Sequence, residues 1–295
     1  MNRTCALCEK NAELLMSHVI PNFAIDWLRQ QGGNLRSSQL PNKRVQDGEK
    51  LPLLCSDCEQ MLSGWEKMFY ESLFIPLHTN LPIQGLKYGP WALKFAVSVS
   101  WRVLLHLSLL SKKIQAIDQQ ALDAWRKFLL GKVQNPGNFE QHILPFNFIT
   151  SCNGFKFSPF MNRYLALTVD RNIICSEKQR IVFTKMGKWF LFGFIRGNKS
   201  SDWKGTKLHV NAGFIANQYV IPHPILELIN NRADKTAAYL ASISPAQVKN
   251  IDKTIMANSD VLAGSDVLRA MEFDIAHSGK DAFQIASPRE NEEHR

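Results

Sequence analysis

Signatures of several large enzyme classes are missing from this sequence. It holds no Walker-type phosphate loop and no GxGxxG, GxSxG or HExxH motif. P-loop nucleotide hydrolysis, dinucleotide binding, serine-hydrolase chemistry and zincin chemistry therefore find no support. No internal repeat and no low-complexity tract is visible either, which argues against a solenoid or a disordered linker. The function must be sought in local clusters of residues.

Uninterrupted apolar runs are also lacking. The most hydrophobic stretch, residues 91–110, is broken by Lys94, Arg102 and His106, whereas a membrane span needs about 20 mostly apolar residues. We expect a buried helix there and no membrane association. No apolar segment follows Met1 where a secretory signal would carry one. A cytoplasmic protein is therefore predicted.

Acidic residues are in the minority, with 26 Asp+Glu against 35 Lys+Arg and a net charge of +9. The excess is concentrated in residues 156–207, which carry 11 basic and three acidic residues. This balance favours a polyanionic partner, so we expect nucleic acid. Aromatic residues alternate with the basic ones there, which fits a base-stacking surface. The continuous apolar run 189–195 favours the other interpretation, in which the aromatics form a core and the lysines face solvent.

Cysteine is scarce, but four of the six cysteines form two pairs with two residues between the members, Cys5/Cys8 and Cys55/Cys58. In a chain without an export signal, such pairs are typical of metal ligation rather than disulfides. Four thiolates complete the tetrahedral shell of a structural Zn²⁺. We predict that these four residues bind one zinc ion; the alternative is two unconnected pairs of reduced thiols.

The patterns divide the chain into four regions. Residues 1–80 hold both cysteine pairs and a polar insert at 31–50, which is expected to be a loop. Residues 81–140 form a helical segment, because apolar residues recur there at steps of three and four. Residues 141–285 are expected to form an α+β domain of unknown role, and residues 286–295 a frayed tail.

Local signals make finer predictions about these regions. Asp118 is a plausible N-cap for a helix. Met186-Gly187 is expected at the turn of a β-hairpin. Residues 164–169 and 208–214 are predicted as further strands, and residues 225–243 as a helix.

Two features accompany the cysteine pairs. Ser17-His18-Val19-Ile20-Pro21 follows the first pair, and Glu59 directly follows the last cysteine. Over residues 5–74 this arrangement resembles the Cys₄-type HNH (ββα-metal) endonuclease family. That family sets its zinc knuckles around a hairpin bearing an acidic-His-x-x-Pro motif, followed by a helix that starts at the last cysteine pair. Together these patterns predict an α+β protein with an N-terminal zinc treble clef of the HNH type, a helical middle, and a β-rich C-terminal part with closing helices.

The resemblance implies an endonuclease that acts on DNA and uses Mg²⁺ or Mn²⁺ for catalysis beside the structural zinc. His18 matches the general base that deprotonates the attacking water. The sequence departs from the family at Ser17, where the family has Asp or another metal ligand, and serine is a poor ligand for a hard cation. It departs again at Glu59, where the family has Asn or His; the carboxylate of Glu59 can bind Mg²⁺ through oxygen.

A second carboxylate lies on the same helical face, because Glu66 follows Glu59 by seven residues. The two carboxylates either bind the catalytic metal or form a solvated face, with Glu59 favoured in the first helical turn. His18 is either the base or a structural histidine packed under the hairpin. We predict a metal-dependent endonuclease with His18, Glu59 and Glu66 as catalytic residues. The alternative, favoured by Ser17, is an inactive zinc-stabilised module that binds nucleic acid or a partner protein.

Overall fold

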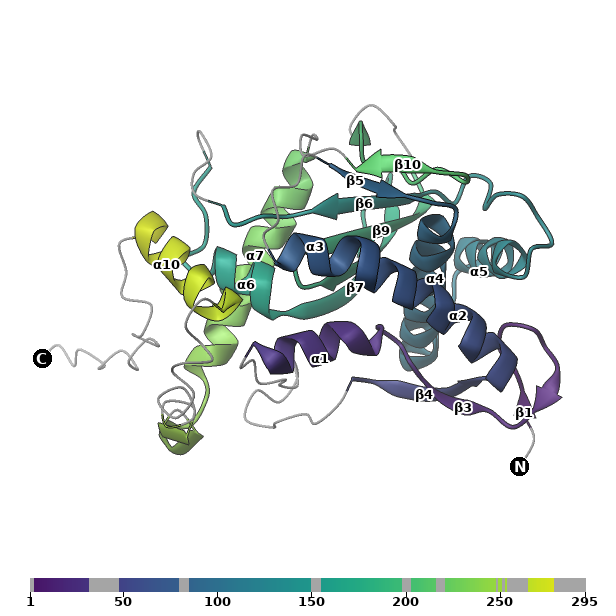
Figure 1. Ribbon diagram of the computed structural model, residues 1–295, viewed down its shortest axis with the longest axis horizontal. Helices are drawn as coiled ribbons and strands as arrows, with labels where there is room; N and C mark the ends of the chain where they lie inside the picture. The colour runs from purple at the N-terminus through teal and green to yellow at the C-terminus, as the bar shows by residue number, and fades with distance from the viewer. Residues whose placement is uncertain are drawn as a thin grey trace, which may run out of the picture. The chain divides into compact units, whose positions relative to one another are not determined.

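The computed structural model describes residues 3–31, 48–79, 85–149, 155–197, 203–215, 221–247, 249–250, 253 and 265–278. The chain is a mixed α/β protein (Figure 1), and its two cysteine pairs lie in the N-terminal part of the sequence. Most of the polar insert expected at 31–50, and all of the tail expected at 286–295, lie outside the described residues.

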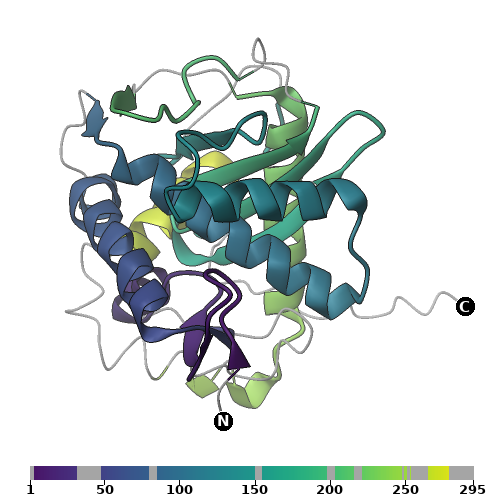
Figure 2. The ribbon, with the colours of Figure 1, turned by 90° about the vertical axis from the view of Figure 1, so that its right-hand side faces the viewer.

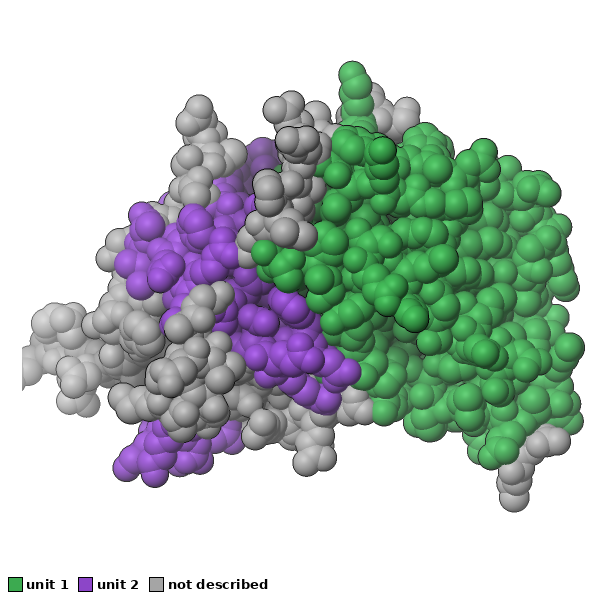
Figure 3. Space-filling view, viewed as in Figure 1, with its two compact units in different colours: residues 1–25, 48–146, 169–222 green, residues 26–47, 147–168, 223–295 purple. Residues whose placement is uncertain are grey.

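Two compact units make up the molecule (Figure 3). Each is assembled from separate stretches of the chain. Unit 1 contains residues 1–25, 48–146 and 169–222, and unit 2 contains residues 26–47, 147–168 and 223–295. The four consecutive regions expected from the sequence are a division of another kind and stay a prediction.

Within its described residues, unit 1 holds the strands and a series of helical segments. Its strands are β1 (Arg3–Thr4), β2 (Asn11–Ala12), β3 (Leu15–His18), β4 (Lys50–Leu54), β5 (Leu86–Tyr88), β6 (Gln141–Pro145), β7 (Val169–Cys175), β8 (Arg180–Met186), β9 (Trp189–Arg196) and β10 (Gly213–Ile215). Its helical segments are α2 (Ser56–Phe69), the π-helical turn η1 (Tyr70–Phe74), α3 (Ile75–His78), α4 (Trp91–Ser111) and α5 (Ala116–Leu129). The strands pair as β1-β2, β3-β4, β10-β5 and the four-stranded sheet β6-β9-β8-β7.

The four-stranded sheet is the centre of unit 1, and its hairpin β8–β9 confirms the predicted turn. Met186 pairs with Trp189, and Gly187 between them has φ +55°, a conformation that glycine adopts without steric cost. Phe190 and its aromatic neighbours on these two strands are buried, so they form a core and not a stacking surface. The expectation that the lysines face solvent is wrong for Lys185 and Lys188, which are also buried.

The helix α4 lies against this sheet. It contacts all four strands and packs beside α5 and α2 (Figure 2). By length and composition α4 could cross a membrane, but 67% of its most apolar window is buried inside the protein. The core helix of a folded unit has the same composition, and the packing agrees with the buried helix expected at residues 91–110.

Three of the finer predictions differ from the structure. Asp118 is the third residue of α5 and not its N-cap; Gln115 caps the helix, and the Asp118 carboxylate accepts a hydrogen bond from the Gln115 N–H. The strand predicted at 164–169 is mostly the helix α6 (Met161–Leu167), because a short apolar run suits either structure. The strand predicted at 208–214 is reduced to β10 at its end.

The described residues of unit 2 include the helices α6, α7 (His223–Ala241) and α10 (Asp266–Ser278), and the second half of α1 (Asn22–Gln30) falls within the same unit. The predicted helix at 225–243 is confirmed by α7. An ion pair between Arg163 of α6 and Asp274 of α10, at 2.9 Å, joins two of these helices.

Candidate metal centre

The first cysteine pair lies in a tight turn between β1 and β2. The Cys5 N–H donates to the Lys10 carbonyl, and the Glu9 N–H donates to the Cys5 carbonyl, both at 2.9 Å. Glu9 has φ +64°, the left-handed conformation that reverses the chain directly after Cys8. The Ala6 N–H donates to the Leu53 carbonyl at 3.0 Å. This last bond attaches the turn to β4, next to the second cysteine pair.

The second pair lies where β4 ends and α2 begins. Cys55 is the N-cap of α2 and has extended backbone angles, and Cys58 is buried in the first turn. The unpaired N–H groups at a helix N-terminus favour negative charge, so this position suits thiolate ligands. The strand β3, which follows Cys5 and Cys8 in the sequence, pairs with β4, which directly precedes Cys55. This pairing brings the two cysteine pairs towards each other.

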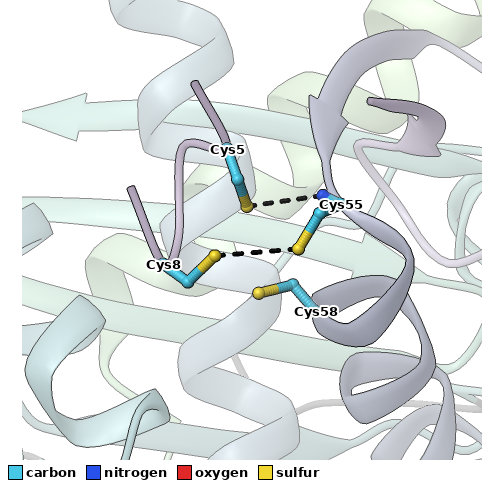
Figure 4. Close-up of side chains that lie close together, drawn as sticks. All are labelled: Cys5, Cys8, Cys55 and Cys58. Carbon is cyan, nitrogen blue, oxygen red and sulfur yellow. Dashed lines mark hydrogen bonds between the residues drawn. The ribbon is translucent and has the colours of Figure 1, made fainter. Parts of the chain in front are cut away.

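The four thiols meet at one point (Figure 4). All four sulfur atoms lie within 4.8 Å of one another, and the Cys8 and Cys55 sulfurs are 3.7 Å apart. A tetrahedral zinc site with Zn–S bonds of about 2.3 Å places its sulfurs about 3.8 Å apart. The cluster could therefore bind a metal ion, and its dimensions are consistent with structural zinc.

Hydrogen bonding within the cluster separates the acidities of its thiols. Burial acts to raise the pKa of Cys5, but hydrogen bonds from the backbone of Cys8, Cys55 and Leu7 outweigh it and lower that pKa to about 7. The Cys55 N–H donates to the Cys5 sulfur at 3.4 Å. Burial, together with the neighbouring thiols of Cys55 and Cys8, raises the pKa of Cys58. A cation at the centre of the cluster would compensate the negative charge of the thiolates and so favour their deprotonation.

The strand residue Ser17 and the helix residue Glu59 are in contact beside this cluster. Ser17 is 1% exposed, and its Oγ donates to Glu59 Oε2 at 2.6 Å. The carboxylate of α2 therefore lies at the strand position that directly precedes His18. His18 is half-buried at the end of β3, opposite Lys50. Gly48 lies beside the imidazole: a Cβ atom placed on Gly48 would be 3.4 Å from the His18 ring, an ordinary van der Waals distance.

Glu66 has a different partner. Its Oε1 accepts a hydrogen bond from Arg102 Nη2 at 2.6 Å, and Arg102 Nη1 also donates to the His18 carbonyl at 2.9 Å. Among the residues that the structure describes, only the four cysteines form a group of three or more potential ligands within reach of one ion. His18, Glu59 and Glu66 thus do not converge on a single point. Both carboxylates are half-buried and paired, so they are not a plain solvated face either.

Sequence patterns did not predict the part that Arg102 plays. In the sequence, Arg102 is only one of the polar residues that interrupt the apolar stretch 91–110. In the structure its side chain is 2% exposed. A cation at a core position of a helix requires a buried partner, because an unpaired buried charge is very costly. The need for a buried partner could have been predicted from the sequence. The spacing of residues along the chain did not identify Glu66 or the His18 carbonyl as that partner.

Comparison with known proteins does not extend the assignment: no protein-family model, no curated protein sequence and no solved structure matches the chain. The fold and the site define a mixed α/β protein with an N-terminal cluster of four cysteines that could hold a metal ion. The likeness to HNH endonucleases rests on the residues quoted from the sequence.

Proposed function

We propose that residues 5–74 form a zinc-stabilised treble clef of the HNH type and that the protein is a metal-dependent nuclease acting on DNA. The order of elements supports this: a cysteine turn, the paired strands β3 and β4, and then α2 with the last two cysteines at its N-terminus. The contact between Ser17 and Glu59 carries the proposal. It places a carboxylate beside the strand residue before His18, where the family has its acidic metal ligand.

Each group has a separate role in the proposed site. Zinc with four thiolates has no open coordination position, so it serves folding and not catalysis. Glu59 would bind a Mg²⁺ or Mn²⁺ ion, which supplies positive charge to the scissile phosphate and the leaving oxygen. His18 would take the proton from the attacking water. The ion pair with Arg102 favours a supporting role for Glu66 instead of metal ligation.

A second candidate function is a zinc-stabilised module that binds nucleic acid without cutting it. The observation that favours it is the lack of a second metal-ligand group among the described side chains. Ser17 points the same way, because its hydroxyl is occupied by Glu59 and is a weak ligand for a hard cation. The net charge of +9 suits a nucleic-acid partner under either proposal. A cytoplasmic location and a partner protein remain predictions in both cases.

Cleavage assays separate the two candidates. Full-length protein is incubated with supercoiled plasmid in Mg²⁺ or Mn²⁺, beside the variants His18→Ala and Glu59→Gln and the control His209→Ala, which changes an exposed histidine of unit 1. The nuclease proposal expects cleavage by wild type and by the control, with a loss of about 10²–10⁴-fold in His18→Ala. Equal rates in wild type and His18→Ala refute it. Salt-sensitive binding without cleavage by any form supports the binding module.

A further inference from the structure

Arg102 joins three elements that lie far apart in the sequence. From α4, its guanidinium donates to the Ser98 carbonyl at 3.3 Å, to the His18 carbonyl at 2.9 Å and to the Glu66 carboxylate at 2.6 Å. The His18 contact spans 84 residues and the Glu66 contact spans 36. Because the guanidinium is a rigid plane with a fixed fork of donors, it fixes its acceptors relative to one another.

The carbonyl that Arg102 holds lies where β3 stops pairing. His18 opposite Lys50 is the last pair of the β3–β4 ladder, and the next bond runs from the Val19 N–H to the Glu49 carbonyl at 2.9 Å. His18 is thus the last residue held by the ladder, and its imidazole projects from the strand end. A buried cation that binds the carbonyl of the same residue adds a second constraint on the backbone that carries the imidazole.

The opposite side of this strand end has an anchor of its own. The Glu49 carboxylate forms an ion pair with Arg171 of β7. It also lies 3.6 Å from His106 Nδ1, one helical turn beyond Arg102 on α4. Residues of α4 and β7 thus contact both strand ends, the His18 carbonyl of β3 and the Glu49 carboxylate just before β4. Neither α4 nor β7 belongs to the cysteine-bearing segment 5–74.

We infer that Arg102 is a positioning residue for the imidazole of His18, an inference that rests on the proposed nuclease function. Arg102 acts through the backbone of His18 and touches no reacting atom. A general base must lie within hydrogen-bonding distance of the proton it accepts. A misplacement of about 1 Å can cost about 10²-fold in rate. The consequence is that α4 completes the site, so the segment 5–74 alone lacks a part of its machinery.

The experiment compares Arg102 with a second arginine of unit 1 that pairs with a buried carboxylate. Arg180 of β8 bonds to Asp118 of α5 at 2.5 and 2.7 Å, so Arg180→Met is the matched control for loss of an ion pair away from the β3–β4 ladder. Full-length Arg102→Met, Arg102→Lys and Arg180→Met are compared for zinc content, melting temperature, kcat and KM on plasmid DNA. We expect Arg102→Met to lower kcat by about 10²-fold with KM within about twofold. Arg102→Lys is expected to recover part of the loss, because lysine keeps the charge and one bond.

Outcomes that overturn the inference are also defined. If Arg102→Met keeps the wild-type kcat, or Arg180→Met loses as much kcat at the same loss of melting temperature, Arg102 does not position His18. If wild type does not cut at all, the proposed function fails separately, and NMR of the histidine rings decides the positioning. Ring signals of His18 should then move in Arg102→Met and stay in place in Arg180→Met. Unmoved signals in both variants reject the inference.

Discussion

Removal of the zinc ion proposed for the cysteine cluster should unfold the N-terminal part of unit 1. Cys5 and Cys55 are 50 residues apart in the sequence, so a shared ion closes a loop of that length. The chain-entropy relation for a cross-link around about 50 residues gives about 4 kcal/mol of stabilisation at 25 °C. A domain has about 5–15 kcal/mol in all. Loss of the ion therefore removes a large fraction of the stability of this region.

The cross-link term is a lower estimate for the whole effect. Metal–thiolate bonds add to it, since zinc-finger peptides gain about 10–16 kcal/mol from Zn²⁺ at neutral pH. The loss should spread from β1–β4 into α2, whose Phe69 ring stacks on Phe95 of α4 at 4.0 Å between centroids. The four-stranded sheet has its own core and should remain folded. The expected product is a partly unfolded protein.

Elemental analysis and hydrogen exchange measure this directly. Purified protein should contain one zinc per chain, and a chelator should lower the melting temperature and remove exchange protection from residues 3–20 and 50–74. Cys5→Ser should behave like the chelated protein. Cys175→Ser is the control, because Cys175 is exposed and lies outside the cluster. Absence of zinc, or equal melting temperatures for Cys5→Ser and Cys175→Ser, would refute the reasoning and remove the support for the treble clef.

Two further predictions concern buried polar groups of unit 1. Burial lowers the pKa of His78 from 6.5 to about 3, so below pH 6.5 the unfolded chain binds a proton that the folded protein rejects. The free energy of unfolding is then fully present above pH 6.5 and falls towards pH 3 by up to about 5 kcal/mol. Urea unfolding at several pH values should show that His78→Gln loses less stability at acid pH than wild type. The same dependence of unfolding free energy on pH in both proteins would contradict this. Asp118→Ala leaves the Arg180 cation without its buried partner and should cost about 3–5 kcal/mol in denaturant unfolding. The exposed helix residue Asp234→Ala should cost under about 0.5 kcal/mol, and similar losses in both variants would show that the ion pair contributes nothing.

The cysteine spacing predicted the four-cysteine cluster because the members of each pair lie within a single turn of the chain. The two residues between the cysteines fix the geometry of each pair locally. The fold then had only to bring the two turns together. The same holds for the β8–β9 hairpin, where Gly187 supplies the positive φ of the turn. Helical periodicity likewise predicted α4 and α7, because the buried faces of long helices repeat every three to four residues.

Local signals were insufficient where two structures satisfy the same short pattern. Residues 164–169 read as a strand because their apolar run is brief, but most of them belong to α6, which packs against α10 and α7. The helix that begins at the second cysteine pair continues beyond α2, because η1 and α3 carry it on to His78. Pro76, which has no N–H to donate, follows this π-helical turn.

The sequence by itself determined which side chains were available near the N-terminus: four thiols, one histidine before a proline motif, and two carboxylates on one helix face. Only the tertiary structure decided their partners. Ser17 meets Glu59 across 42 residues, and Arg102 meets His18 across 84. Such pairings depend on how helices and strands pack in three dimensions. A buried charge must find a partner wherever the packing places one, and spacing along the chain does not encode that position.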